Sequence, residues 1–156
     1  MKTIMKLGFG ILVLGLASCQ LVGSEEAAPK TTDDTPLVDT EWDLVSFEEV
    51  GEGASDAGSV GILLIFEEDG RVKGGSYQKA GGPKAANQYS GIYKLVSPNI
   101  IVIDSMGTTL VGEPEGSRYT EYYSALRDTT EYELKGETLR LYYDTGSKAL
   151  VFRARA

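Results

Sequence analysis

Residues 131–154 read EYELKGETLRLYYDTGSKALVFRA, and this run by itself predicts three consecutive antiparallel strands. Apolar and polar side chains alternate, as in strands with one buried face, through 131–135, 137–143 and 148–154. The turns Lys135-Gly136 and Asp144-Thr145-Gly146 separate these stretches and supply the residue types that tight turns require. The carboxyl-terminal part of the chain is therefore expected to be a three-stranded meander.

The same alternation occurs in five stretches upstream: 41–47, 60–66, 71–77, 87–95 and 100–104. Two of the gaps between them hold further turn signals, Asp69-Gly70 and Pro98-Asn99. About eight strands in one small domain predict a mainly β fold. We expect an eight-stranded antiparallel β-barrel-like domain or a strongly bent sheet.

One stretch, 113–128, has helical rather than strand periodicity. Its apolar side chains recur at a spacing of three and four residues, at Tyr119, Tyr122, Tyr123 and Leu126. Pro114 suits a first helical turn. We predict one amphipathic helix that lies over the strands as a lid or plug, with the tyrosine stripe on its buried side.

Charge and residue types exclude several kinds of function. The chain of 156 residues has 23 acidic and 15 basic side chains, a net charge of -8, and a nucleic-acid partner would need a clustered basic surface. The absence of histidine and the single cysteine remove the commonest general base, the commonest metal ligand and any internal disulfide. We expect no nucleic acid, no metal and no cofactor.

The first residues predict export. Lys2 and Lys6 precede an apolar run of ten residues, 7–16, which as a helix would reach about 15 Å, half of a hydrocarbon core of about 30 Å. This is the pattern of a signal peptide over 1–18. Its end resembles the lipobox of bacterial lipoproteins, whose cysteine is lipidated after cleavage, and consists of Leu16, Ala17, Ser18 and Cys19.

Lipidated Cys19 would be the first residue of the mature protein, and the membrane would be its partner through the lipid anchor. The alternative is an ordinary cleaved signal peptide that contains a cysteine. Residues 19–37 lack apolar periodicity and predict a flexible tether, followed by one domain over 38–156. The expected location is the cell envelope, and Gln20 resembles the sorting signal for the outer membrane in Gram-negative bacteria.

Five segments in this order and spacing resemble the META domain, also called HslJ-like: TEWDL (40–44), NQYSGIY (87–93), MGTTL (106–110), EYYSAL (121–126) and YELKGETLRL (132–141). The last strand, Leu150-Val151-Phe152, agrees as well. The family is typified by a heat-shock-induced bacterial envelope protein. The resemblance implies a small β-barrel-like fold with one helix, a role in envelope stress and no established enzymatic activity.

The chain departs from the family pattern at two positions. Many relatives have a cysteine immediately before the asparagine and another after the Thr-x-Met-Ala segment, where this chain has Ala86 and Gly112. The two cysteines are missing together, as expected if they form a disulfide in the relatives. We therefore expect this domain to be held together by packing alone.

Four residues are candidates for contact with a ligand or partner: Trp42, Asn87, Tyr89 and Tyr93. Each also has a structural interpretation that the pattern favours. Trp42 would fill one end of the barrel, and Asn87 would fix the entry of the glycine-rich loop 78–86 through its amide. The two tyrosines share one face of a strand, so they would belong to the same surface.

No motif of enzymatic chemistry stands out. The segment 74–84, GGSYQKAGGPK, mixes glycine and lysine but lacks the Gly-Lys-Ser/Thr sequence and the following helix of a phosphate-binding loop. Acidic neighbours such as Glu48-Glu49 and Glu67-Glu68-Asp69 point to opposite faces of a strand or lie in turns, so they build no two-carboxylate site by themselves. We expect no catalytic residue.

Three hypotheses for function remain. The first is a non-catalytic, lipid-anchored envelope protein whose domain binds or scaffolds an envelope protein. The second is a lipocalin-like carrier that holds a small apolar ligand inside the barrel, and the third is a hydrolase that uses the carboxylates. A packed barrel interior favours a binding surface, whereas an empty interior favours a carrier.

Overall fold

The computed structural model describes residues 35–156. The predicted signal peptide, the lipobox with Cys19 and the predicted tether up to residue 34 lie outside the described residues. Among 35–156, no helix combines the length and the apolar character needed to cross a membrane.

The described residues form nine strands, one α-helix and one short 3-10 helix. They are β1 (Trp42–Glu49), β2 (Gly53–Asp56), β3 (Gly61–Phe66), β4 (Arg71–Tyr77), β5 (Gln88–Ser97), β6 (Ile100–Thr108), α1 (Tyr119–Arg127), β7 (Glu131–Lys135), β8 (Thr138–Tyr143), η1 (Asp144–Gly146) and β9 (Lys148–Ala154). All eight predicted strands are present. The additional strand, β2, has the sequence GASD with every residue exposed, so it carries no alternating pattern that could predict it.

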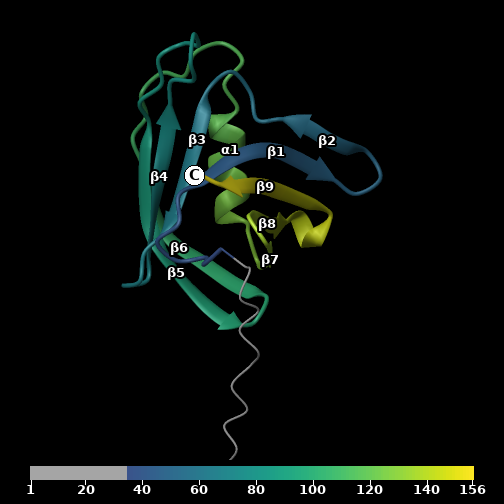
Figure 1. The fold of residues 1–156 in the computed structure, drawn as a ribbon. Coiled ribbons are helices and arrows are strands. Elements are labelled where there is room, and N and C mark those ends of the chain that lie inside the picture. Colours follow the sequence, from purple (N-terminus) through teal and green to yellow (C-terminus); the bar gives the residue numbers. More distant parts are fainter. Residues whose placement is uncertain (1–34) are drawn as a thin grey trace, which may run out of the picture. The chain divides into compact units, whose positions relative to one another are not determined.

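Eight of these strands close into a ring, which confirms the predicted antiparallel barrel-like fold (Figure 1). The strands follow one another around the ring, and β1 closes it by pairing with β9 from Trp42↔Ala154 to Glu49↔Lys148. The first residues of β1 pair on the other side with β3, and its last residues pair with β2. Strand β2 is therefore an addition to the edge of the ring rather than a part of it.

The ring has its shortest strand pairing between β6 and β7. The two strands pair only at Ile100↔Glu131, with flanking backbone hydrogen bonds from Ile101 to Thr130 and from Tyr132 to Asn99. Helix α1 packs against β6, β8 and β9 and so covers this side of the barrel (Figure 1). The helix thus takes the position of the predicted plug.

Helix α1 begins at Tyr119, six residues later than predicted. Gly116 has a φ of +77°, which interrupts helical geometry, and Ser117 forms an isolated antiparallel bridge with Gly58. Pro114 therefore lies in the preceding loop rather than in the first turn. The predicted apolar stripe is confirmed in its main part, because Tyr119, Tyr122 and Leu126 are buried.

The interior of the barrel is packed with large side chains. Trp42, Phe66, Tyr122 and Phe152 have no exposed surface, and they belong to a continuous core of buried residues. Leu37, predicted as the last residue of the tether, is also buried in this core. A packed interior leaves little room for a ligand and favours a function carried by the outer surface.

Candidate functional site

Three of the four predicted site residues, Trp42, Tyr89 and Tyr93, lie in the core. The indole nitrogen of Trp42 donates a hydrogen bond to the carbonyl oxygen of Leu37 at 3.1 Å. The ring of Tyr93 packs edge-on against Phe66 at 4.8 Å between ring centroids, and its hydroxyl donates to the carbonyl of Glu67 at 3.0 Å. Both side chains thus have a structural partner for their polar atom.

Tyr89 is also buried, but it lies directly beneath the surface of the sheet. Its hydroxyl donates to the carbonyl of Leu63 at 3.0 Å and is 2.6 Å from the hydroxyl of Tyr122. Gly74 makes this position possible, because a Cβ there would overlap the Leu63 carbonyl and the Tyr89 hydroxyl. Burial raises the pKa of both Tyr89 and Tyr122 well above its ordinary value, so both hydroxyls stay protonated.

Asn87 joins two segments that lie far apart in the sequence. Its side-chain nitrogen donates to the carbonyl of Val111 at 2.8 Å, and its side-chain oxygen accepts from the backbone N–H of Val111 at 2.8 Å. The side-chain nitrogen also bonds to Glu113. The amide therefore fixes residues 109–113, whereas the sequence predicted that it would fix the loop 78–86.

This contact corrects the expectation that packing alone holds the domain together. Ala86 and Gly112, the positions where many relatives have cysteines, are the immediate neighbours of Asn87 and Val111 in the chain. The two segments are joined here by the hydrogen bonds of Asn87, which is almost completely buried. Buried hydrogen bonds of this kind resist exchange with water and stabilise the contact.

An open groove of about 750 Å³ crosses the outer face of β3, β4 and β5 and reaches the end of β6. We call it the outer groove. Its apolar floor includes Leu63 and Ile65, which point away from the core because they alternate with buried residues of β3. Gly75 and Gly107 also line it, and the Cβ position of Gly107 faces open space. The volume lies in the range of small-molecule sites.

Polar groups surround this floor. Gln88 and Ser90 are exposed on β5, and Lys73 and Arg155 line the groove as its two cations. Each cation already has an acidic partner, because Lys73 is 2.5 Å from Glu67 and Arg155 is 2.7 Å from Asp43. The groove can therefore offer hydrogen-bonding groups without a large unpaired charge.

The Arg155 end of the groove is built as a compact network. The guanidinium donates two hydrogen bonds to Asp43, at 2.9 and 2.7 Å, and one to Glu41 at 2.9 Å. The Tyr77 ring lies 4.8 Å from the guanidinium carbon, and its hydroxyl donates to Asp43 at 2.7 Å. Hydrogen bonding to Asp43 raises the pKa of Arg155. The pKa of Tyr77 is also raised, mainly because the hydroxyl is partly buried and in second place because it bonds to the Asp43 carboxylate.

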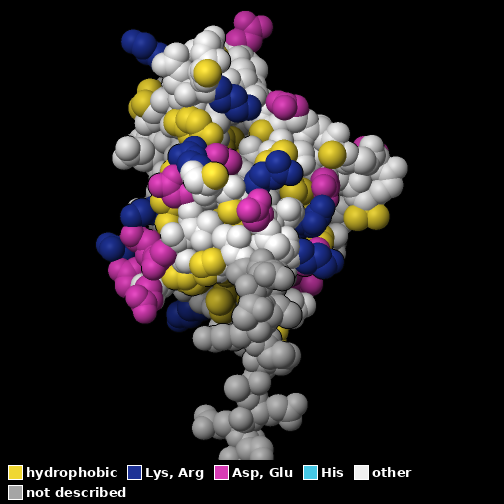
Figure 2. Space-filling view, viewed as in Figure 1, with side chains coloured by type: hydrophobic (Ala, Val, Ile, Leu, Met, Phe, Trp, Pro, Cys, Tyr) yellow, Lys and Arg dark blue, Asp and Glu magenta, His cyan; other side chains and the backbone are white. Residues whose placement is uncertain are grey.

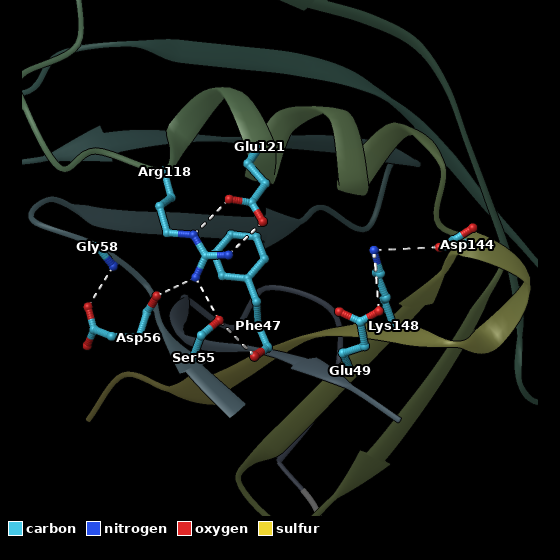
Figure 3. A network of polar contacts seen from close by, with 9 residues as sticks. All are labelled: Phe47, Glu49, Ser55, Asp56, Gly58, Arg118, Glu121, Asp144 and Lys148. Atoms are coloured by element: carbon cyan, nitrogen blue, oxygen red, sulfur yellow. Dashed lines mark hydrogen bonds and ion pairs between the residues drawn. The ribbon is translucent and has the colours of Figure 1, made fainter. Parts of the chain in front are cut away.

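A second polar network joins the start of α1 to the β1–β2 hairpin (Figure 3). Arg118 donates to the Ser55 hydroxyl at 2.9 Å and to the Asp56 carbonyl at 2.7 Å, and it forms a two-bond ion pair with Glu121. Its guanidinium carbon lies 3.7 Å from the centre of the Phe47 ring. All three guanidinium nitrogens of Arg118 donate hydrogen bonds, which indicates that its role is to hold β2 in place.

Of the four predicted site residues, the fold brings Asn87 and Tyr89 to the outer groove and leaves Trp42 and Tyr93 away from it. Sequence reasoning missed Lys73, Tyr77 and Arg155. A signal was available in Gly74-Gly75, since a glycine pair inside a strand marks a place where other groups approach closely.

Charged side chains do not gather into a single patch on the face seen in Figure 2, where acidic and basic groups are interspersed. Within residues 35–156, no three histidine, cysteine, aspartate or glutamate side chains come together as a possible metal site. Most of the acidic neighbours noted in the sequence form ion pairs, namely Glu48, Glu49, Glu67 and Asp69.

Comparison with known proteins agrees with this architecture. A family model for the META domain matches residues 35–156, as the resemblance predicted. Among solved structures, the chain is similar to a DUF4847 family protein from Bacteroides vulgatus, with a TM-score of 0.51 and 13% identity over 75% of this chain and 93% of that chain. At that identity the likeness concerns the fold alone, and no curated protein matches. Because the family model covers more than half of its length, the chain belongs to the META domain family.

Proposed function

We propose that this protein is a non-catalytic, lipid-anchored cell-envelope protein whose META domain binds a largely apolar, uncharged partner segment in the outer groove. The groove carries the proposal, because it combines an apolar floor at Leu63 and Ile65 with exposed hydrogen-bonding groups at Gln88 and Ser90. The packed interior supports a surface site over a ligand held inside the barrel.

The bonding of polar groups beside the groove supports a binding rather than a catalytic role. Ser76 donates to Glu113 and accepts from the backbone N–H of Asn87, and Thr108 bonds to Tyr119. These hydroxyls are engaged in holding the fold together. A role in envelope stress remains a prediction from the family resemblance.

The lipid anchor is tested by metabolic labelling with palmitate in the native host. We expect label on the wild-type chain and none on Cys19→Ser, because the lipobox presents that sulfur for acylation. A Leu16→Ala variant, which alters the lipobox and keeps the sulfur, serves as a second check on processing. Equal labelling of wild type and Cys19→Ser would contradict the anchor.

The groove is tested by filling it. A side chain at Gly107 has open space around its Cβ and would project into the groove, so Gly107→Trp should block binding without disturbing the fold. Gly112→Trp is the matched control, since Gly112 also has open space and does not line the groove.

The readout is photo-crosslinking in cells from a benzophenone amino acid placed at Gln88. We expect one discrete adduct, about tenfold weaker in Gly107→Trp and unchanged in Gly112→Trp. An adduct that persists in Gly107→Trp, or a probe that crosslinks nothing, would argue against the groove as the binding site.

A further inference from the structure

The β5–β6 hairpin exposes an unusual share of apolar surface. Of the eight large apolar side chains that are exposed in the described residues, four lie on this hairpin: Ile92, Leu95, Val96 and Val102. We call these four residues the hairpin patch. A cluster of exposed apolar residues on one element is typical of a contact with another molecule or with lipid.

The pairing of the strands explains the exposure. Strand β4 begins at Arg71, opposite Ile92, and the backbone N–H of Tyr93 donates to the carbonyl of Gly70 just before it. Beyond Tyr93, the residues of β5 do not pair with β4. The pairing of β5 with β6 shifts between Leu95 and Ser97, which leaves Val96 as an unpaired, bulged residue with 65% of its surface exposed. The hairpin therefore extends beyond the neighbouring strands (Figure 1).

The charge of the hairpin differs from that of the whole protein. From Gln88 to Thr108, the hairpin contains two charged residues, Lys94 and Asp104, and Asp104 is the cross-strand partner of Ile92. The full chain has a net charge of -8. The hairpin is thus an apolar element without net charge on an acidic protein, and it can approach a lipid surface with less electrostatic repulsion than the rest of the domain.

The hairpin lies at the end of the barrel where the described chain begins (Figure 1). The backbone N–H of Asp39, near the start of the described chain, donates to the carbonyl of Phe66 at 2.7 Å. The hydroxyl of Tyr93, where the hairpin begins to extend beyond β4, donates to the carbonyl of the next residue, Glu67. Thr35 follows Cys19 by about 16 residues, a length that spans at most about 58 Å. A lipid on Cys19 would therefore leave this end of the barrel within reach of the membrane.

We propose that the hairpin patch inserts into the lipid surface to which Cys19 is anchored and so docks the domain on the membrane in one orientation. This inference rests on the proposed lipid anchor. The acidic turn Glu67-Glu68-Asp69 lies between β3 and β4 at the same end, so apolar burial rather than charge must drive the contact. The contact should accordingly form on uncharged phosphatidylcholine and should be weaker on anionic vesicles.

The test places a fluorescent reporter on the patch. The lipidated protein is purified and reconstituted into phosphatidylcholine vesicles with or without brominated acyl chains, which quench tryptophan only at close range. Val96→Trp reports on the hairpin, and Val50→Trp, at a position that is 79% exposed in the β1–β2 turn, is the matched control. The buried Trp42 contributes the same background to both.

We expect brominated lipid to reduce the added emission of Val96→Trp at least twofold and to leave that of Val50→Trp unchanged. Equal emission of Val96→Trp in the two kinds of vesicle would overturn the proposal. Quenching of both variants to the same extent would also overturn it, because it would mean that the domain contacts lipid in no fixed orientation.

A second measurement separates the hairpin from the anchor. The mature chain made without its leader, and so without lipid, is titrated with a large excess of the same vesicles. We expect the double variant Leu95→Ser, Val96→Ser to have a partition coefficient into the vesicles about tenfold lower than that of the wild type. The control variant Val50→Ser should leave the partition coefficient unchanged. If palmitate labelling fails but this difference is seen, the anchor is wrong and the lipid contact stands. A protein dimer that these variants abolish, with no vesicle binding, would assign the patch to a second copy and overturn the proposal.

Discussion

At the scale of single residues, Gly74 determines whether Tyr89 can occupy its place in the core. A methyl group at Gly74 would overlap the backbone carbonyl of Leu63, which has no freedom to rotate away. We expect Gly74→Ala to lower the free energy of unfolding by about 3 kcal/mol. Gly107→Ala is the control, since its Cβ would meet nothing, and it should change stability by less than about 1 kcal/mol in urea denaturation. Equal effects of the two variants would contradict this role of Gly74.

The buried pair Tyr89 and Tyr122 predicts a loss of stability at alkaline pH. Burial raises the pKa of both hydroxyls in the folded protein, whereas in the unfolded chain they ionise near about pH 10. Their contribution is therefore complete below about pH 10 and is lost as the pH rises through the folded-state values. Between about pH 10 and the raised pKa of the folded state, the free energy of unfolding should fall by about 1.4 kcal/mol per pH unit for each tyrosine.

Urea denaturation at a series of alkaline pH values measures this slope, and tyrosinate absorbance follows the ionisation. Tyr122→Phe should reduce the slope by the share of one tyrosine, because phenylalanine carries no ionisable group. A slope that is the same in the variant and in the wild type would show that Tyr122 ionises freely in the folded protein and would refute the prediction.

At the scale of elements, Arg118 fastens β2 to the start of α1. Its guanidinium holds Ser55 and the Asp56 carbonyl, and it lies against Phe47 (Figure 3). Strand β2 pairs only with β1, over four residue pairs, and the contacts of this arginine attach the strand to the start of α1 as well.

We expect Arg118→Ala to destabilise the protein by about 2 kcal/mol and to speed amide exchange at residues 53–58 more than in the core. Arg118→Lys keeps the charge but loses the planar fork, so it should rescue less than half of the effect. Hydrogen exchange followed by mass spectrometry measures both variants. Full rescue by Arg118→Lys would mean that a positive charge alone, without the planar guanidinium, is sufficient to hold β2 in place.

At the scale of the whole molecule, the ring of strands has a weak seam between β6 and β7. A single residue pair, Ile100↔Glu131, joins these strands, whereas β8 and β9 pair over six positions. We expect the amides of Ile101 and Tyr132, which bridge the seam, to exchange faster in the native protein than those of Leu141 and Leu150. Equal protection at the two places, measured by NMR, would show that helix α1 makes the seam as stable as the rest of the ring.

The positions of the strands along the chain were predictable because they depend on neighbouring residues. Alternation between polar and apolar side chains and turns such as Lys135-Gly136 act over a few positions, so eight of the nine strands could be located without the structure. The tyrosine stripe of α1 was predictable for the same reason. The helix start was not, because residues 113–118 are held by distant partners such as Gly58 and Asn87.

Local pattern thus determined the class of fold and the resemblance to the META family, and it singled out Asn87 and Tyr89 without giving their partners. Only the tertiary structure decided that β1 and β9 close the ring, that Asn87 reaches across to Val111, and that Arg155 meets the strands of the outer groove. The physical reason is the range of the interactions. Alternation and turn preference are properties of adjacent residues, whereas barrel closure, burial and the shape of a groove depend on side chains that folding brings together from distant parts of the chain.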